Sequence, residues 1–323
     1  TLRKWCVCVV DNILACRRRV EQVMNSLERK RYVKDTVAAY MYLAPALIVI
    51  IVFNLFPAFY ALYISLFDTN LIGRWDWVGL GNYSELFRDA DFLQSLVNTG
   101  KYVLGTVPVG MALALLIAWL LNKPIRGLSA YRTAYFLPYV TPIVAISIVW
   151  TWIYKEDSAG MLNSLLCLFG AEPQAWLLDP KWSMFALCLM SVWRHLGYNV
   201  VLFLAGLQNI PAEYYEAAEI DGASGWSMFA HITWPLLSPT TYFILMVSII
   251  GSFQVFTQVY VLWPSVSGGP LGTTRVVVKY LYDQGWGAFR FGYASAIGYI
   301  LFAIIFVLTL VQKDIVGKRV HYQ

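Results

Sequence analysis

Long hydrophobic stretches constrain this chain more than any other feature of its sequence. Crossing the hydrocarbon core of a bilayer as a helix takes about 20 predominantly apolar residues. Only 13% of the 323 residues are charged and 59% are hydrophobic, whereas about a quarter of a soluble domain is charged. The sequence therefore predicts an all-α integral membrane protein. Six segments qualify as transmembrane helices: 40–67, 98–121, 134–154, 184–208, 239–263 and 291–312.

Lys and Arg are distributed unevenly between the two sides that these helices define. One side, which holds 15 of them, consists of 1–39, 122–133 and 313–323. The other side, which holds 7, consists of 68–97, 155–183 and 264–290. By the positive-inside rule the first side is cytoplasmic, and both termini lie there. Because their distribution explains the basic residues as determinants of membrane orientation, we expect membrane lipid as a partner and no nucleic acid. The Trp-rich loops of the other side fit either an aromatic belt or a docking surface for an external protein.

The two ends of the chain fall outside the predicted six-helix domain, which covers 37–315. The segment 1–36 is basic, too charged to span, and fits either an interfacial amphipathic helix or a basic tail. The segment 316–323 is predicted to be a cytoplasmic tail. No cleavable signal peptide is expected. The five cysteines lack the spacing of a zinc or redox site, so no metal site is predicted.

The loop 209–238, between the fourth and fifth predicted spans, is acidic and contains no Lys or Arg. It reads as two short helices joined by a turn. Asn209 is the expected N-cap and Pro211 suits the first helical turn. Gly222 is a helix stop, and a second helix over 223–232 is expected to be broken by Pro235. The orientation of the chain in the membrane does not require an acidic loop here. We therefore interpret the loop as a rigid protrusion that fits a recess in another protein.

The residues of this loop resemble a known motif. "EAAEIDGASGWSMFAHITWPLLSP" resembles the EAA loop of permease subunits of binding-protein-dependent ABC importers. Glu216, Ala217, Ala218, Gly222 and Pro235 match the family pattern, and Trp234 stands where the family usually has Leu. The likeness extends over about 37–315 and favours the sugar-importing branch, the maltose-type and glycerol-phosphate-type first permease subunits. It rests on "LFPAFYALYISLF", "VGLGNY", "FLAGLQNIP", "SFQVFTQVYVL", "GGP" and "FRFGYASAIGYILFAII".

The resemblance implies a type I ABC importer permease of a bacterial cytoplasmic (inner) membrane. The loop would be a coupling helix that docks into a cytoplasmic ATPase, with Glu216 meeting a basic group there. The implied partners are a second permease, two ATP-binding cassette subunits and an extracytoplasmic solute-binding protein. The chain has no GxxxxGK[ST] phosphate loop, so it is not expected to be an enzyme, and ATP and Mg would be bound by the partner ATPase. The implied coupling residues are Glu213, Glu216, Ala217, Ala218, Asp221, Gly222 and Pro235.

Polar and aromatic residues in the fifth predicted span are suited to a sugar. Gln254 and Gln258 are four residues apart and are predicted to share one helical face, with Phe253 and Phe256 nearby. Amides can bind sugar hydroxyls and ring faces can pack on C–H groups. Intramembrane amides also join helices to one another. The sequence leaves both interpretations open, substrate pathway and helix packing.

Arg194 lies near the middle of the fourth predicted span, and His195, Tyr198 and Asn199 follow it. An arginine at the bilayer midplane costs at least about 2.5 to 3.5 kcal/mol on insertion scales, so it should face a cavity or a partner. No acidic residue of the six predicted spans can pair with it. One interpretation is a salt bridge to the second permease, or snorkelling toward water. The other places Arg194, Tyr198 and Asn199 in the substrate pathway, where the planar guanidinium meets an acidic sugar.

Two other function classes were compared with the importer. An ion-coupled secondary transporter usually shows internal repeats and ionisable residues at the midplane, and Arg194 with His195 gives it some support. A membrane enzyme needs clustered carboxylates or histidines within the spans, and the three histidines of this chain are not grouped. The sequence therefore favours the importer and identifies neither the sugar nor its charge.

Overall fold

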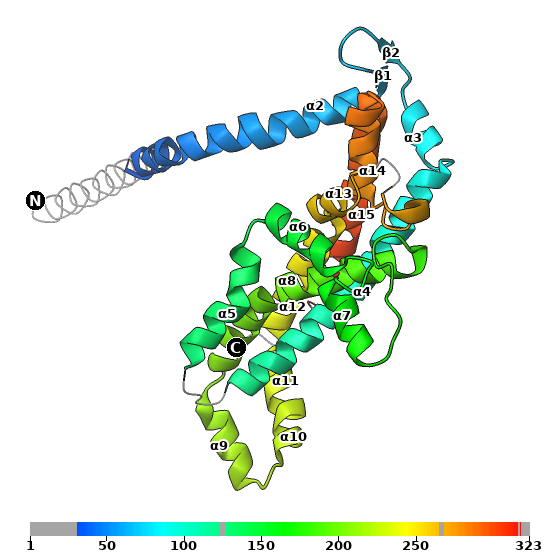
Figure 1. Cartoon of the computed structure of the whole chain (residues 1–323). Helices are drawn as coiled ribbons and strands as arrows, with labels where there is room; N and C mark the ends of the chain where they lie inside the picture. Colours follow the sequence, from blue (N-terminus) through cyan, green and yellow to red (C-terminus); the bar gives the residue numbers. More distant parts are fainter. Residues whose placement is uncertain (1–30, 123–126, 265–267, 316, 318–323) are drawn as a thin grey trace, which may run out of the picture. The chain divides into compact units, whose positions relative to one another are not determined.

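The structure is a computed structural model that describes residues 31–122, 127–264, 268–315 and 317 (Figure 1). Most of the predicted N-terminal segment and of the predicted tail lies outside these residues. The chain divides into two units, Thr1–Ala61 and Leu62–Gln323, which are described separately. The described part of the first unit belongs to one helix, Arg31–Ile64. This helix contains a π-helical turn, η1 (Ile51–Leu55), and continues as α2 (Phe56–Ile64). The turn ends two residues before Pro57, whose missing N–H disturbs regular α-helical bonding.

Three helices of the second unit are each long and apolar enough to cross a bilayer unbroken. They are α4 (Ala90–Leu121), α8 (Pro180–Gln208) and α15 (Phe291–Ile315). Asp89 caps α4 by accepting hydrogen bonds from the N–H groups of Asp91 and Phe92. Asp179 caps α8, with Pro180 in its first turn. Both helices begin before the predicted spans 98–121 and 184–208, because their capped first turns are polar and precede the apolar part.

The third predicted span, 134–154, is broken rather than continuous. α5 (Leu128–Val140) and α6 (Ile143–Ile153) meet at 101°. Thr141 and Pro142 are extended between them, with ψ values of 137° and 128°. Proline disfavours a helical conformation in the residue before it, so Pro142 explains the break at Thr141. Pro138 lies inside α5.

The fifth predicted span, 239–263, is also broken. α12 (Ser238–Phe253) ends at Gln254, and α13 (Thr257–Leu262) begins after the non-helical Phe256 (φ −146°, ψ −62°). The two sides of the break pack into different cores. Phe253 belongs to a cluster with α4 and α15, whereas Val255 belongs to a cluster with α6 and α8. Tertiary packing therefore turns the chain at a place where its local sequence reads as helix.

A further bend lies just before α12. α10 (Gly225–Met228), the π-helical η2 (Phe229–Thr233) and α11 (Trp234–Leu236) form one helical run. This run meets α12 at 62°, at the fully buried Leu237. The prediction that Pro235 breaks the chain was wrong, because the helical run continues through Pro235 and the π-helical η2 just before it takes up the irregular bonding that a proline imposes. Counting each bent pair as one span, the described residues contain up to six spans, which confirms the predicted all-α membrane fold.

The remaining described elements lie in the connections. A two-stranded antiparallel sheet, which the sequence reading missed, pairs β1 (Phe67–Thr69) with β2 (Trp75–Trp77). The other connecting elements are short helices: α3 (Gly81–Leu86), α7 (Met161–Leu168), α9 (Ala212–Ile220), η3 (Pro270–Gly272), α14 (Val277–Tyr282) and η4 (Asp283–Gly287).

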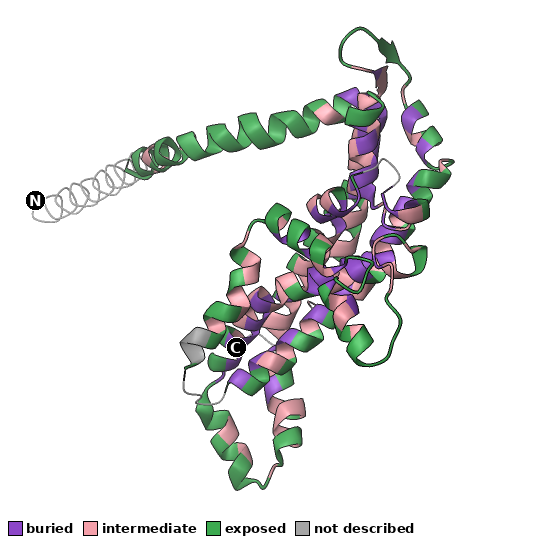
Figure 2. Ribbon diagram, viewed as in Figure 1, coloured by how far each residue is buried: buried purple, intermediate pink, exposed green. Residues whose placement is uncertain are grey.

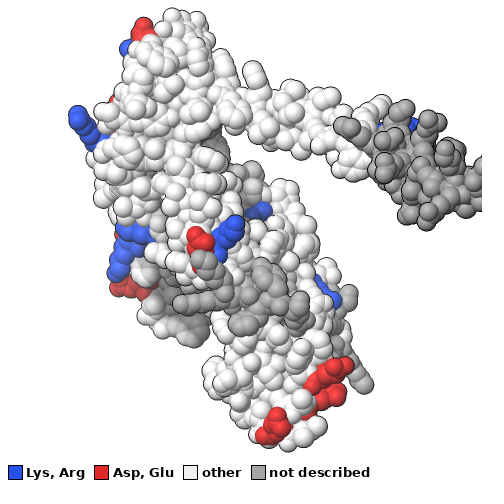
Figure 3. Space-filling view, turned by 180° about the vertical axis from the view of Figure 1, so that it is seen from behind, with Lys and Arg blue, Asp and Glu red and all other residues white. Residues whose placement is uncertain are grey.

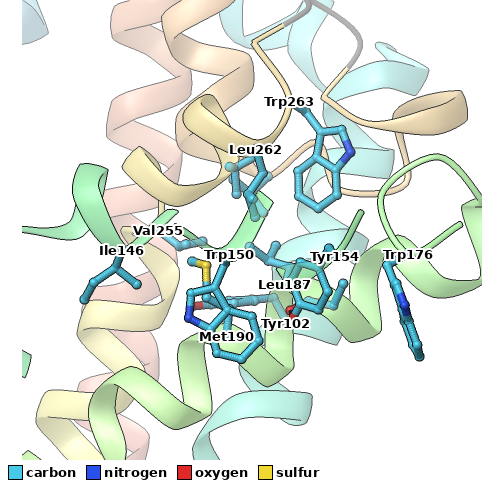
Figure 4. Close-up of a cluster of buried hydrophobic side chains, with 13 residues drawn as sticks. Tyr102, Ile146, Trp150, Tyr154, Trp176, Leu187, Met190, Val255, Leu262 and Trp263 are labelled. Atoms are coloured by element: carbon cyan, nitrogen blue, oxygen red, sulfur yellow. Dashed lines mark hydrogen bonds between the residues drawn. The ribbon is translucent and has the colours of Figure 1, made fainter. Parts of the chain in front are cut away.

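Buried side chains of the second unit form three clusters, visible where the helices of Figure 2 turn purple. α4 and α8 pack along each other and contribute to the core along most of their length. The first cluster joins them to α6 and α13 and is rich in aromatic rings, including Tyr102, Trp150 and Tyr154 (Figure 4). The Tyr154 hydroxyl donates to the carbonyl of Ala186 at 2.8 Å, which ties the end of α6 to α8.

Asp89 also connects three elements at the start of α4. Its carboxylate accepts hydrogen bonds from the hydroxyls of Tyr280 on α14 and Tyr293 on α15. Partial burial raises the pKa of Asp89, but the two tyrosine hydroxyls and the two backbone N–H groups outweigh it and hold the pKa below its usual value. This end of the helix assembly therefore depends on an ionised Asp89.

Candidate functional site

A cavity of about 350 Å³ lies where α12 breaks, with α4, α5 and α8 forming its other walls. Its volume is at the lower end of the range of about 300–1,000 Å³ that is typical of small-molecule sites. The structure brings six of the seven predicted pathway residues into its lining: Arg194, Tyr198, Asn199, Gln254, Phe256 and Gln258. The seventh, Phe253, packs in the core instead. A helix broken at membrane depth is tolerated where it lines such a cavity, and transporter sites are typically built this way.

The two glutamines both line the cavity, but they lie on different helices rather than on one helical face as predicted. Gln254 is the C-cap of α12 and Gln258 lies on α13, so they do not share one continuous helical face. Gln254 is exposed to the cavity side. Gln258 is buried, and its amide donates to the hydroxyl of Tyr102 on α4 at 3.3 Å. Gln258 therefore both packs against α4 and lines the cavity, whereas the exposed Gln254 side chain lines the cavity without being held by packing.

Arg194 is the only Lys, Arg, Asp or Glu among the described residues that line the cavity. Its Nη1 lies 3.3 Å from Nε2 of His195, and the His195 Nδ1 lies 2.9 Å from the carbonyl oxygen of Ser191. A carbonyl accepts only, so Nδ1 donates and Nε2 is the acceptor for the guanidinium. The guanidinium carbon also lies 5.6 Å from the ring centre of Tyr139. Among described residues the buried Nε of Arg194 has no hydrogen-bond partner.

Aromatic rings form two parts of the cavity wall. Tyr139 of α5 stacks on Tyr198 of α8, with ring centres 4.5 Å apart. In another part of the lining, Phe256 contacts Tyr260 and Tyr282 at 5.5 and 5.1 Å between ring centres. Ring faces of this kind pack against the C–H groups of a sugar. The sequence reading missed Tyr139, although Pro138 and Pro142 on either side of it mark a broken helix.

Gly197 allows α5 to approach α8 closely enough to place Tyr139. A Cβ atom at Gly197 would lie 1.8 Å from the carbonyl oxygen of Tyr135, which no real side chain could occupy. The backbones of the two helices are therefore in direct contact one turn from Arg194. Gly197 therefore determines how closely α5, which carries Tyr139, approaches α8, which carries the guanidinium of Arg194.

The loop 209–238 forms a second candidate site, at the end of the second unit where α9 and α10 lie in Figure 1. Asn209 closes α8 as its C-cap, and Pro211 is the N-cap of α9, so the predicted N-cap at Asn209 was wrong. Gly222 has φ +75°, a left-handed conformation that glycine adopts without strain and that ends α9. Its N–H donates to the carbonyl of Glu219 at 3.0 Å, and the N–H of Ala223 donates to that of Ala218 at 2.9 Å.

The two halves of this loop are tied together on one side. The hydroxyls of Tyr215 on α9 and Thr233 on η2 lie 3.0 Å apart. Trp226 stacks on Phe229 at 5.6 Å between ring centres, and Phe229 contacts Trp119 of α4 at 6.4 Å. The loop is therefore a preformed hairpin of helices rather than a flexible connection. The sequence reading did not identify the bond between Tyr215 and Thr233.

The other side of the loop is acidic and exposed. None of its four carboxylates forms an ion pair with a described Lys or Arg. In Figure 3 the acidic side chains at the lower end of the molecule form a red patch with no basic side chain among them. Among the other predicted coupling residues, Ala217 and Gly222 are exposed, whereas Ala218 and Pro235 are half-buried. The exposed carboxylates are Glu213, Glu216, Glu219 and Asp221.

Neither site has the composition of a metal centre. Among the described residues, no group of three or more His, Cys, Asp or Glu side chains lies close enough to hold a metal ion. The cavity offers amides, hydroxyls, aromatic faces and one guanidinium, which can bind a polar organic molecule. The loop offers an acidic surface of fixed shape, which can bind a basic surface of another protein.

Comparisons with known proteins identify the family of this chain. Residues 107–322 match the family described as "Binding-protein-dependent transport system inner membrane component". The chain is 38% identical over 291 residues to the arabinooligosaccharides transport system permease protein AraP of Bacillus subtilis, covering 90% of this chain and 92% of AraP. It is 34% identical to the sn-glycerol-3-phosphate transport system permease protein UgpA of Agrobacterium fabrum, covering 89% and 97%.

A solved structure shows the same fold. A chain of a bacterial ABC transporter involved in the import of the acidic polysaccharide alginate superposes with a TM-score of 0.77, at 22% identity, covering 89% of this chain and 98% of that one. None of these similarities supports the ion-coupled secondary transporter that the sequence left as an alternative. The extent of the family match and the identity to full-length permeases show that this chain belongs to the inner-membrane permease components of binding-protein-dependent ABC transporters.

Proposed function

We propose that this chain carries a sugar or a short oligosaccharide across the inner membrane, through the cavity beside the α12 break. The observation that carries the proposal is the composition of the cavity wall. The amide groups of Asn199, Gln254 and Gln258 line the same space as the rings of Tyr139, Tyr198 and Phe256. Amides pair with sugar hydroxyls, and ring faces pack with C–H groups. The names of AraP and UgpA, an oligosaccharide and a glycerol phosphate permease, support this solute class.

The energy source would be a separate ATPase bound at the α9–α10 loop. The loop presents an exposed, unpaired acidic face next to small side chains, and its shape is fixed by Gly222 and by the bond between Tyr215 and Thr233. Glu216 would contact a basic group of the ATPase. Two ATPase subunits would hold ATP and Mg, and this chain would remain non-catalytic. A second permease subunit would complete the translocation pathway.

The orientation in the membrane follows from the same assignment. The loop faces the cytoplasm because ATP is there, which agrees with the excess of Lys and Arg in the segments on its side. Both termini are then cytoplasmic. The hairpin β1–β2, α7 and α14 face the other side, where an extracytoplasmic binding protein would deliver the sugar.

The test is reconstitution of the complete transporter in proteoliposomes with its binding protein. We expect uptake of a labelled arabinose or galactose oligosaccharide that requires both ATP and the binding protein. Tyr139→Leu, which keeps an apolar side chain but removes the ring, should reduce uptake at least tenfold without releasing the ATPase subunits. The matched control is Phe169→Leu, since Phe169 is 88% exposed and lies outside the cavity. Uptake by this chain alone, driven by an ion gradient, would refute the proposal.

A further inference from the structure

We infer that the cavity selects an anionic sugar, either a uronate or a sugar phosphate, and that Arg194 binds its carboxylate or phosphate oxygens. This inference rests on the proposed function and adds the charge of the solute to it. It starts from the position of Arg194. Fourteen residues of α8 precede it and fourteen follow it, so it lies about 21 Å from either end of the helix at 1.5 Å per residue.

A cation at this depth needs a counter-charge. The neighbours of Arg194 orient it but carry none, because His195 accepts through a neutral imidazole and Tyr139 offers a ring face. No Asp or Glu belongs to the described lining of the cavity. The cost of burying the guanidinium is therefore not offset by an ion pair within the described part of the chain.

The hydrogen-bonding groups of Arg194 are only partly used. Nη1 is directed to His195, and the buried Nε has no partner among described residues. A guanidinium presents its donors as a planar fork that matches two oxygens of a carboxylate or phosphate. The contact with Tyr139 restrains the fork, so an entering anion meets a cation that is already oriented. A neutral sugar would leave the charge uncompensated.

The same cavity supplies groups for the rest of a sugar. Gln254 is exposed at the end of α12, and Asn199 lies five residues after Arg194 on α8. Both can pair with ring hydroxyls, while Tyr198 and Phe256 present faces for the C–H groups. A uronate and a sugar phosphate share this chemistry and differ in the number of anionic oxygens. The experiment therefore includes one probe of each kind.

The test measures equilibrium binding to the complete transporter in nanodiscs without its binding protein, so that the binding protein's own selectivity does not enter. The probes are two pairs, each of an anionic and a neutral saccharide: digalacturonate with galactobiose, and galactose 6-phosphate with galactose. We expect the anionic member of at least one pair to bind about tenfold or more tightly, the scale of one charge-assisted hydrogen bond. Arg194→Gln should abolish this preference and Arg194→Lys should keep part of it. The control Arg88→Gln, at an exposed arginine outside the cavity, should keep all of it.

A second variant keeps the arginine and supplies the counter-charge. Ser191→Asp places a carboxylate one helical turn before Arg194 in the same lining, and it should abolish the preference as Arg194→Gln does. Equal binding of both members of each pair, or an anion preference that survives Arg194→Gln, would overturn the inference while leaving sugar transport intact. Loss of the second permease subunit from Arg194→Gln would also overturn it, because Arg194 would then pair with that subunit. Absence of binding by all four probes, together with no ATP-dependent uptake of any saccharide, would remove the proposed function as well.

Discussion

Replacing Gly197 by alanine puts a methyl group against the backbone of α5. The new Cβ atom would lie 1.8 Å from the carbonyl oxygen of Tyr135 and 2.4 Å from its carbonyl carbon. Because the obstacle is backbone, no side-chain rotation relieves it. The two helices must separate by about 1.5 Å before the atoms reach ordinary van der Waals contact.

The size of the effect follows from this geometry. Overpacking a well-packed contact costs about 1–3 kcal/mol. Gaining alanine in place of glycine inside a helix returns roughly 1 kcal/mol at most. The net loss should lower Tm by several degrees, given roughly 2–4 °C per kcal/mol for domains of this order of size. Function should suffer more, because the displacement carries Tyr139 away from Arg194 and Tyr198.

Two other glycines make the measurement specific. A methyl group added at Gly100 on α4 would have no atom within 4 Å, so Gly100→Ala should be neutral or stabilising. At Gly206 the methyl group would meet the side chains of Thr240 and Leu237 at 2.6 and 2.8 Å, which can move. Thermal unfolding in nanodiscs and binding-protein-stimulated ATPase activity should therefore rank the variants at Gly100, Gly206 and Gly197 in order of increasing damage. A Gly197→Ala variant as stable and active as Gly100→Ala would refute the direct contact of α5 with α8.

Four further predictions concern the loop, the glutamines and the cap of α4. Glu216→Ala should insert and fold normally, since this exposed carboxylate has no described ion-pair partner, but should co-purify with less ATPase and transport less. Asn and Asp both tolerate the φ of +75° at position 222, so Gly222→Asn and Gly222→Asp differ mainly in charge. A larger loss of ATPase binding by Gly222→Asp would therefore be due to the added charge. Equal and normal transport by both variants would rule out a tight acidic docking face. Gln254→Ala should reduce sugar transport without changing Tm, whereas Gln258→Ala should lower both, because only Gln258 is buried and bonded to α4. Unchanged uptake in both variants would show that neither glutamine contacts the solute. Because the pKa of Asp89 is lower in the folded than in the unfolded protein, thermal stability should fall as the pH drops below about 4, the unfolded pKa, and through the folded pKa. Asp89→Asn should be about 1–3 kcal/mol less stable at pH 7 and should lack this loss of stability in acid. A wild-type Tm that does not change over that range would contradict the account of Asp89.

The transmembrane pattern was predictable from the sequence because hydropathy and span length act locally. The breaks in the third and fifth spans were not predicted. Pro142 carried a local signal for the first, since it restricts Thr141. The second has no comparable signal. It arises because Phe253 and Val255 are drawn into different clusters, and cluster membership depends on helices far away in the sequence.

Each candidate site likewise has features that the sequence predicts and features that depend on packing between distant residues. The helix–turn–helix form of the loop 209–238 was predictable in outline, because its acidity, its glycine stop and its motif lie within one short segment. Its stiffness was not, because the bond between Tyr215 and Thr233 joins residues 18 positions apart. In the cavity, Arg194 was singled out by its cost in a membrane, which is a property of one residue. Its neighbours Tyr139 and Tyr102 come from other spans, and their positions depend on the close approach at Gly197 and on the packing of α4 against α8.

The position of the loop relative to the cavity indicates how the two could be linked. Both ends of the loop continue into helices that form walls of the cavity, α8 on one side and α12 on the other. From Arg194 to Gln208 and from Ser238 to Phe253 the chain advances by about 21 and 22.5 Å, so the two walls are of similar length. At the base of the loop, Leu207 and Leu237 are buried together, and Gly206 packs against Thr240. Because the base is packed and the loop is closed by its own hydrogen bond, a force on the exposed acidic tip would move both walls together. We therefore expect ATPase movement to act on the α12 break and on Arg194 at the same time.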